Sequence, residues 1–294
     1  MKKLPRCALL LLAAALVACS SDGDSADGQG TVAFTTWGEE YIEQEIPPTS
    51  AEGKVIIQDG WTIRYSKFLV VLSEVQVAEE DAAPVASLAA PILFDMHTPG
   101  VKAVTSFANL PGKPYAHVSY AIAPATPAVT LGTGATEADK AEMVTNGYSV
   151  FVDGVATKAS ISKKFTWGFK TNTLYERCKG ELAGKETEGV VVTNGGTDEV
   201  QLTIHGDHFF YDDLQSSLAK VRFDNIAAAD ANADGAVTLE ELAAVDLADT
   251  KKITAGPYGT GSAAGINDLR AFVEALSRTV GHYRGEGECL ARAR

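Results

Sequence analysis

The chain has 294 residues, and 46% of them are hydrophobic, so it has ample apolar material for a core. Its formal net charge at pH 7 is −13, from 25 basic and 38 acidic residues. This balance argues against nucleic acid as a partner and favours cations near the surface.

The N-terminal segment has the features of a secretory signal. Three basic residues precede an apolar run over residues 8–18 that is too short to span a bilayer. The run ends in Leu-Val-Ala-Cys, which resembles the lipobox of bacterial lipoproteins. This resemblance implies cleavage before Cys19, acylation of that cysteine and anchoring to a membrane through its lipid. The alternative is an ordinary signal peptide whose apolar run happens to include a cysteine.

Under the lipoprotein interpretation, residues 1–18 are the signal peptide, and residues 19–30 are the lipidated cysteine with a polar, flexible tether. Loss of three basic residues with the signal would change the net charge from −13 to −16. Ser20, directly after the cysteine, is similar to the residue found in lipoproteins sorted to the outer membrane. We therefore expect a cell-envelope protein on the outer membrane; the sequence identifies no protein partner.

The cysteine inventory predicts one disulfide. Cys7 leaves with the signal and Cys19 is lipidated, so only Cys178 and Cys289 remain in an oxidising compartment. A disulfide between these two is the prediction. Two free thiols, or a thiolate metal site, are the alternatives.

Residues 31–211 form short runs rich in β-branched and aromatic residues, separated by turn residues. Asp59-Gly60 and Asp153-Gly154 each stand between such runs, a pattern typical of hairpin turns. This part is therefore predicted to be an antiparallel β-sandwich. One short helix is expected over residues 136–144, with Thr136 as its N-cap.

Residues 212–294 have apolar residues at helical spacing. Helices are expected within residues 212–230, 238–248 and 267–282, the last beginning at Asn267 or Asp268. The predicted fold class is a β-rich α+β protein, in which a β-sandwich is followed by a helical part.

The sharpest chemical motif is "DANADGAVTLEE", residues 230–241, between two of the predicted helices. It resembles an EF-hand loop, in which six positions supply oxygen ligands to calcium and a glycine at position 6 makes a sharp turn. Gly235 stands at that position. The resemblance implies calcium ligands from Asp230, Asn232, Asp234 and Glu241, from the backbone carbonyl of Ala236, and from Thr238 through water.

The loop predicts a structural calcium rather than a calcium sensor. Sensor EF-hands pair and expose Met-rich grooves, whereas this loop occurs once in a chain with 3 Met. We therefore expect calcium to hold two helices together. The alternative is a metal-free acidic turn whose carboxylates cap helix ends.

A second candidate metal site is the segment "HGDH" at the end of a predicted strand. His205, Asp207 and His208 could bind zinc or copper, with His282 added if the disulfide brings the C-terminal segment close. The alternative is that these histidines hydrogen-bond in a corner between sheet and helix. The segment is superficially similar to the metallo-β-lactamase signature, but Thr203 stands in place of its first histidine, and we reject that assignment.

The order of the β-rich segments is similar to that of periplasmic copper-binding proteins of the methanobactin-associated family. The segments that carry this resemblance are "FLVVLSEVQV", "YAHVSYAIAP", "FTWGF" and "LTIHGDH". No copper ligand of that family can be matched residue by residue, so none is carried over. Sequence motifs for nucleophilic or nucleotide-dependent enzymes are absent, and nothing recommends a catalytic assignment. The leading hypothesis is a lipid-anchored calcium-binding envelope protein that acts as a binding or structural module, and the alternative is a transition-metal-binding protein.

Overall fold

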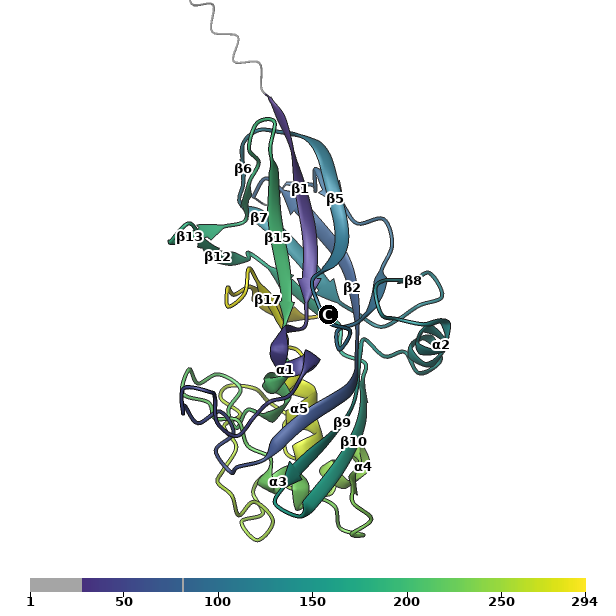
Figure 1. Ribbon diagram of the computed structural model, residues 1–294, viewed down its shortest axis with the longest axis vertical. Coiled ribbons are helices and arrows are strands. Elements are labelled where there is room, and N and C mark those ends of the chain that lie inside the picture. Colours follow the sequence, from purple (N-terminus) through teal and green to yellow (C-terminus); the bar gives the residue numbers. More distant parts are fainter. Residues whose placement is uncertain (1–27, 81) are drawn as a thin grey trace, which may run out of the picture.

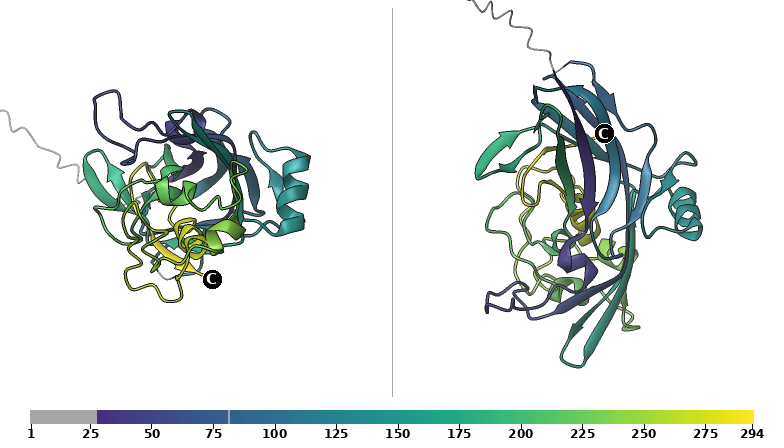
Figure 2. Two further views of the ribbon diagram at one scale, coloured as in Figure 1. Left: turned by 90° about the horizontal axis from the view of Figure 1, so that it is seen from below. Right: turned by 45° about the horizontal axis from the view of Figure 1, so that its top comes forward.

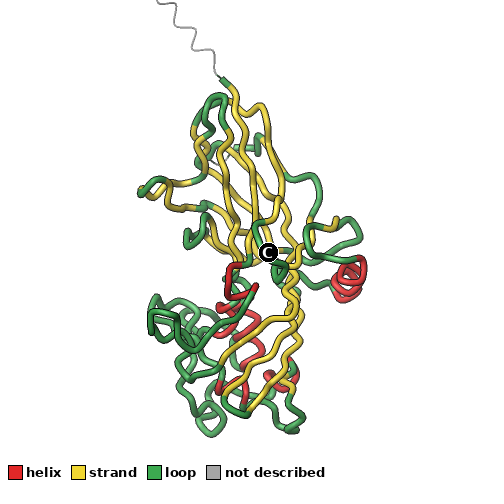
Figure 3. Tube along the Cα trace, viewed as in Figure 1, coloured by secondary structure: helices red, strands yellow, loops and turns green. Residues whose placement is uncertain are grey.

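The computed structural model describes residues 28–80 and 82–294. The predicted signal peptide, Cys19 and most of the predicted tether lie outside this part of the chain. Strands predominate and the helices are short, which confirms a β-rich fold (Figures 1 and 3). None of the helices in the described ranges combines the length and the hydrophobicity that a membrane span requires.

Most strands belong to two sheets. The smaller sheet has the order β17 (Gly281–Tyr283), β15 (Thr197–Ile204), β1 (Gln29–Trp37) and β5 (Lys102–Pro111). The larger sheet has the order β16 (Ala236–Val237), β10 (Ile161–Phe169), β9 (Val150–Lys158), β2 (Thr62–Ala78), β7 (His117–Ile122), β11 (Thr173–Glu176) and β18 (Leu290–Ala293). Three short strands extend it: β3 (Ala86–Ser87) and β4 (Ile92–Asp95) pair with β2, and β8 (Thr130–Leu131) pairs with β4.

Two small strand pairs complete the β structure: β12 (Lys179–Leu182) with β13 (Lys185–Glu188), and β6 (Pro114–Tyr115) with β14 (Val190–Val191). The helices are α1 (Glu39–Glu43), α2 (Glu137–Asn146), the 3₁₀ turn η1 (Asp207–Phe210), α3 (Asp224–Ala227), α4 (Leu239–Ala243) and α5 (Leu269–Leu276).

Strand β2 connects the upper and lower halves of the molecule in Figure 1. Its first part pairs with β9 and its second part pairs with β7. The pairing register shifts within residues 65–67 and 73–76, and Glu74 has a φ of 49°. Such bulges bend a strand and increase its twist. Figure 2 shows the resulting sheets curling around the core rather than lying flat.

The two sheets enclose one apolar core. Phe34 of β1, Phe68 and Val70 of β2, and Val200 of β15 are at most 1% exposed and belong to the same cluster. Val273 of α5 belongs to it as well. Residues of the C-terminal part therefore share the hydrophobic core of the β-rich part.

The predicted antiparallel arrangement is wrong for one pair of strands at the centre of the smaller sheet. Strand β1 pairs in parallel with β15, from Thr31 opposite Thr197 to Trp37 opposite Thr203. Parallel neighbours need a long connection, and here most of the β-rich part lies between the two strands. The carboxyl ends of β1 and β15 consequently meet at one edge of the sheet.

The two Asp-Gly pairs do not make the predicted hairpins. Gly154 lies inside β9, and the β9–β10 hairpin turns after Lys158, at Ala159, which has a φ of 52°. A Cβ atom on Gly154 would lie 2.5 Å from the ring of Phe165, so this glycine makes room for a packed aromatic side chain. Gly60, with a φ of 80°, makes a turn before β2, but the residues before that turn do not pair with β2 as a hairpin strand.

The prediction of a helical C-terminal part is only partly correct. Residues 212–230 are mostly loop, with the single turn α3. The carboxylate of Asp213 accepts hydrogen bonds from the backbone N–H groups of Gln215 and Ser216, and such local bonds compete with a helix. Leu218, expected on a buried helix face, is 82% exposed.

Two helix caps match their predictions. Thr136 caps α2, and Asp268 caps α5 through the backbone N–H of Ala271. Thr238, expected as a calcium contact, caps α4. Helix α5 presents its apolar face to the core, as the spacing of its residues predicts. The chain then returns to the two sheets as β17 and β18, which were not predicted.

The disulfide between Cys178 and Cys289 is confirmed. Its sulfur atoms are 2.03 Å apart, and Cys178 is completely buried. The bond fixes the segment after β17 beside β12, where the backbone N–H of Lys179 also donates to the carbonyl of Glu288 at 2.8 Å. The C-terminal segment is therefore attached to the β-rich part covalently and by hydrogen bonds.

Replacing both cysteines by serine should lower the free energy of unfolding. The bond joins residues 111 positions apart, and closing so long a loop restricts the unfolded chain by up to about 4 to 5 kcal/mol. Urea unfolding of wild type and of Cys178→Ser/Cys289→Ser, each with and without reductant, measures the effect. Reductant should destabilise only the wild type; equal midpoints for the oxidised wild type and the variant would contradict the prediction.

Candidate metal centre

Three histidines come together at the carboxyl end of β15. His205 directly follows that strand, His208 lies in η1, and His282 lies in β17. The ring centres of His205 and His282 are 4.2 Å apart, those of His208 and His282 are 5.0 Å apart, and those of His205 and His208 are 5.3 Å apart. The structure thus joins the predicted cluster to the distant His282.

Strand pairing accounts for this convergence. β17 runs antiparallel to β15 with His282 opposite Thr203, and the backbone N–H of His205 donates to the carbonyl of Val280 at 2.9 Å. The short turn η1 then returns His208 toward the same point. Backbone hydrogen bonds therefore fix where the first and last histidines of the cluster lie.

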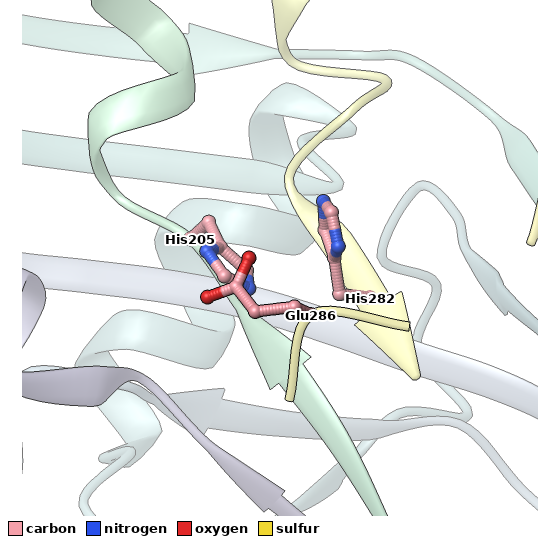
Figure 4. Close-up of side chains that lie close together, drawn as sticks. All are labelled: His205, His282 and Glu286. Carbon is pink, nitrogen blue, oxygen red and sulfur yellow. The ribbon is translucent and has the colours of Figure 1, made fainter. Parts of the chain in front are cut away.

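Carboxylates complete two overlapping groups of possible ligands. One group is His205, Asp207 and His208, and the other is His205, His282 and Glu286. Within each group, one ligand atom from each residue lies within 4.8 Å of the others. Figure 4 shows Glu286 and His282 approaching His205 from the C-terminal segment. His205 belongs to both groups and is the centre of the cluster.

The hydrogen bonds of His208 fix its tautomer. Its Nδ1 lies 2.9 Å from the hydroxyl oxygen of Thr279, and that hydroxyl donates its only proton to the carbonyl of Leu276 at 2.9 Å. Nδ1 must then carry the proton and donate to Thr279. The Nε2 atom of His208 consequently keeps its lone pair, as a metal ligand requires.

His205 is arranged in the same way by Glu39. Its Nδ1 lies 3.4 Å from Oε2 of Glu39, while its Nε2 is buried and has no hydrogen-bond partner among the described residues. In histidines that bind metals, the outer ring nitrogen, which is the one that does not contact the metal, typically pairs with a carboxylate. Glu39 reaches this position because β1 and β15 end together, with Trp37 opposite Thr203.

Two more ligand atoms are buried without partners in the described part of the chain. They are Nδ1 of His282 and Oδ1 of Asp207. The other oxygen of Asp207 accepts a hydrogen bond from the hydroxyl of Tyr211 at 3.1 Å. Buried polar atoms normally have partners, so three unpartnered ligand atoms in one cluster call for an explanation, and a bound ion supplies one.

Burial disfavours the charged forms of His208, His282, Glu39 and Asp207. Burial, together with neighbouring imidazoles, holds the pKa of His208 well below 6.5 and lowers that of His282 to about 4. Burial raises the pKa of Glu39 to about 7, against the opposing effect of His205, and also raises the pKa of Asp207. Without a cation, these carboxylates lie in an environment that disfavours their ionised state; a divalent ion would reverse this.

The predicted calcium loop lies elsewhere, beside β10, and has a tightly turned conformation. Gly235 has a φ of 84°, as the sharp turn of such a loop requires. The backbone N–H of Gly235 donates to Asp230, that of Asp234 donates to Asn232, and that of Ala236 donates to Asp234, at 3.0, 2.8 and 2.8 Å. The first three predicted ligands therefore organise the loop by themselves.

The other parts of the loop differ from the arrangement implied by the resemblance. Glu241 accepts from the backbone N–H of Thr238 at 2.9 Å and caps α4, and Lys163 contacts the carboxylate of Asp230. Ala236 lies in β16, paired with β10. Only one turn of α3 and five residues of α4 flank the loop, because the preceding segment forms the loop structure described above.

Sequence patterns missed the residues that support the histidines. None of the three supporting residues, Glu39, Thr279 and Tyr211, belongs to a metal-binding motif. Glu39 and Thr279 are far in sequence from the histidines that they contact, and Tyr211 donates its hydrogen bond to Asp207 rather than to a histidine. Glu286 carried a weak signal, because it lies four residues after His282. Their roles depend on strand pairing, which local sequence does not specify.

The metal-free protein should lose stability in acid because its buried histidines resist protonation. His282 has a pKa of about 4 when folded and about 6.5 when unfolded, so the unfolded chain gains its proton first. Above about pH 6.5 the histidine is neutral in both states and costs no stability; as pH falls toward 4, its protonation in the unfolded chain progressively lowers the free energy of unfolding. His282→Gln should reduce the loss by up to about 3 kcal/mol.

Urea unfolding in a chelator, at neutral pH and near pH 4.5, measures this effect. His117→Gln changes a histidine outside the cluster and should behave as wild type. Equal acid sensitivity in wild type and His282→Gln would show that His282 is not buried in its neutral form.

Comparison of the chain with protein-family models, with curated proteins and with solved structures gives no match.

Proposed function

We propose that the protein binds a divalent transition metal, zinc or copper, at the histidine cluster. The ligands are His205, Asp207, His208 and His282. The observation that carries this proposal is that three of the five histidines of the chain meet in one cluster with unpartnered ligand atoms. Imidazole nitrogens together with one carboxylate form a donor set that suits zinc and copper better than calcium.

The hydrogen-bonding alternative explains the cluster less well. A structural corner of buried histidines would satisfy both nitrogens of each ring, since an unmet buried polar atom costs about 1 to 3 kcal/mol. Here the outer nitrogens of His205 and His208 have partners, while Nε2 of His205 and Nδ1 of His282 have none in the described structure. One nitrogen paired with a protein group and the other without a partner is the arrangement expected of metal-binding histidines, and it supports the proposal.

The proposed setting is the cell envelope. A lipid on Cys19 would hold the protein to a membrane, with the outer membrane as its expected location. The Cys178–Cys289 disulfide suits an oxidising compartment. There the protein would retain or transfer the metal as a binding module, with no role for nucleic acid.

A second proposal is a structural calcium ion in the loop of residues 230–241. Its support is the complete ligand register, together with the turned backbone around Gly235. Calcium binding would draw the carboxylate of Glu241 away from the cap of α4 and would compete with Lys163 for Asp230. The ion would then hold α3 and α4 together as a small EF-hand-like unit.

Mutation of His205 should abolish the transition-metal site, because this residue belongs to both ligand groups. Wild type should retain about one equivalent of zinc or copper after dialysis against a weak chelator, and His205→Ala should retain almost none, because removing one of four ligands opens the site. His117→Ala, outside the cluster, should retain as much as wild type. Elemental analysis measures the metal content of the three proteins. Equal metal content in wild type and His205→Ala would refute the site.

Calcium should raise the melting temperature through Glu241. In Glu241→Gln the bidentate ligand is lost, so the rise on adding calcium should disappear. Glu240→Gln changes the neighbouring carboxylate, which is outside the ligand register, and should keep the rise. Thermal melts with calcium or with a calcium-selective chelator provide the measurement, and a melting temperature of the wild type that is indifferent to calcium would eliminate the structural ion.

A further inference from the structure

A pocket of about 430 Å³ lies beside the histidine cluster. His208 and His282 form part of its wall, whereas His205 and Asp207 do not line it. The pocket therefore lies on one side of the cluster, and the two remaining ligands lie behind the wall. Its volume is in the range of sites that hold small organic molecules.

The walls of the pocket combine aromatic and apolar surface with a few polar groups. The apolar part comes from Tyr175, Tyr211, Leu214, Leu276 and the disulfide at Cys289. The charged lining residues are Asp213 and Glu288, and no lysine or arginine lines the pocket. Such a wall repels anions and accepts neutral or cationic molecules. The rings of Tyr211 and His208 contact each other with their centres 4.7 Å apart, so the wall next to His208 is aromatic and can pack against a flat ring.

We propose that this pocket binds a small nitrogen base, an amine or a nitrogen heterocycle, which coordinates the metal on the side of His208 and His282. The inference rests on the proposed transition-metal function. The four proposed protein ligands come from two overlapping groups of three atoms, and a nitrogen base on the pocket side would be an additional donor, because zinc accepts a fifth ligand and copper(II) favours tetragonal geometries. Nitrogen donors suit zinc and copper, and the acidic wall selects them over carboxylates and phosphates.

Cobalt substitution makes the proposal measurable, because the visible spectrum of cobalt(II) depends on its ligands. The whole protein is loaded with cobalt and titrated with imidazole, and separately with acetate. Imidazole should change the spectrum saturably while the cobalt remains bound, and acetate should leave the spectrum unchanged. A spectrum indifferent to imidazole, or one changed equally by acetate, would overturn the proposal.

Two tryptophan substitutions separate pocket binding from general access to the metal. Ala291 lines the pocket from β18, and Ala293 lies two residues along the same exposed strand and does not line it. Ala291→Trp should weaken the apparent affinity for imidazole by about tenfold or more, whereas Ala293→Trp should match wild type. Ser217→Trp, in the loop on the pocket wall, should also weaken imidazole binding. It provides an independent test if Ala291→Trp disturbs the fold.

The cobalt content of each sample distinguishes the two proposals. Failure of the wild type to bind cobalt, zinc or copper would reject the metal centre, and the nitrogen-base site with it. A stoichiometric metal whose spectrum ignores imidazole would leave the metal centre standing and reject only the ligand site. Imidazole affinity that is equal in wild type, Ala291→Trp and Ser217→Trp would place the ligand outside this pocket.

Discussion

The position of β15 between β1 and β17 is the constraint on which the histidine cluster depends. β1 runs parallel to β15 and delivers Glu39 to the outer nitrogen of His205, whereas β17 runs antiparallel and delivers His282 to the inner side. Strands β1 and β15 thus end, and β17 begins, at the same end of one sheet, although the three strands are far apart in sequence. The backbone hydrogen bonds of that sheet fix the backbone positions of the cluster residues, whatever rotamers their side chains adopt.

Local chemistry accounts for what the sequence could predict. The caps Thr136 and Asp268 act within three residues of the helices that they begin, and the two cysteines left after the expected export had one possible partner each. The segment from His205 to His208 was recognised as a candidate metal site because its candidate ligands are close together in the sequence. Each of these features depends on residues that are close in sequence, or on simple elimination.

The errors arise where tertiary packing overrules a local pattern. Asp153-Gly154 has the composition of a turn, but the ring of Phe165 needs the space over the glycine, and β9 continues through it. Residues 212–230 have helical spacing, but Asp213 binds the backbone N–H groups that a helix would use. Parallel pairing of β1 with β15 has no local signature, so the role of Glu39 could not be predicted from the sequence.

The location of His282 in β17, close to the C-terminus, determines when the cluster can exist. A chain that stops before β17 has His205, Asp207 and His208 but neither His282 nor the strand that pairs with β15. Only a chain that includes β17 can pair this strand with β15 and bring His282 to the other histidines. The histidine cluster therefore forms only after β17 has paired with β15, so it assembles later than the strands that precede β17 in the chain.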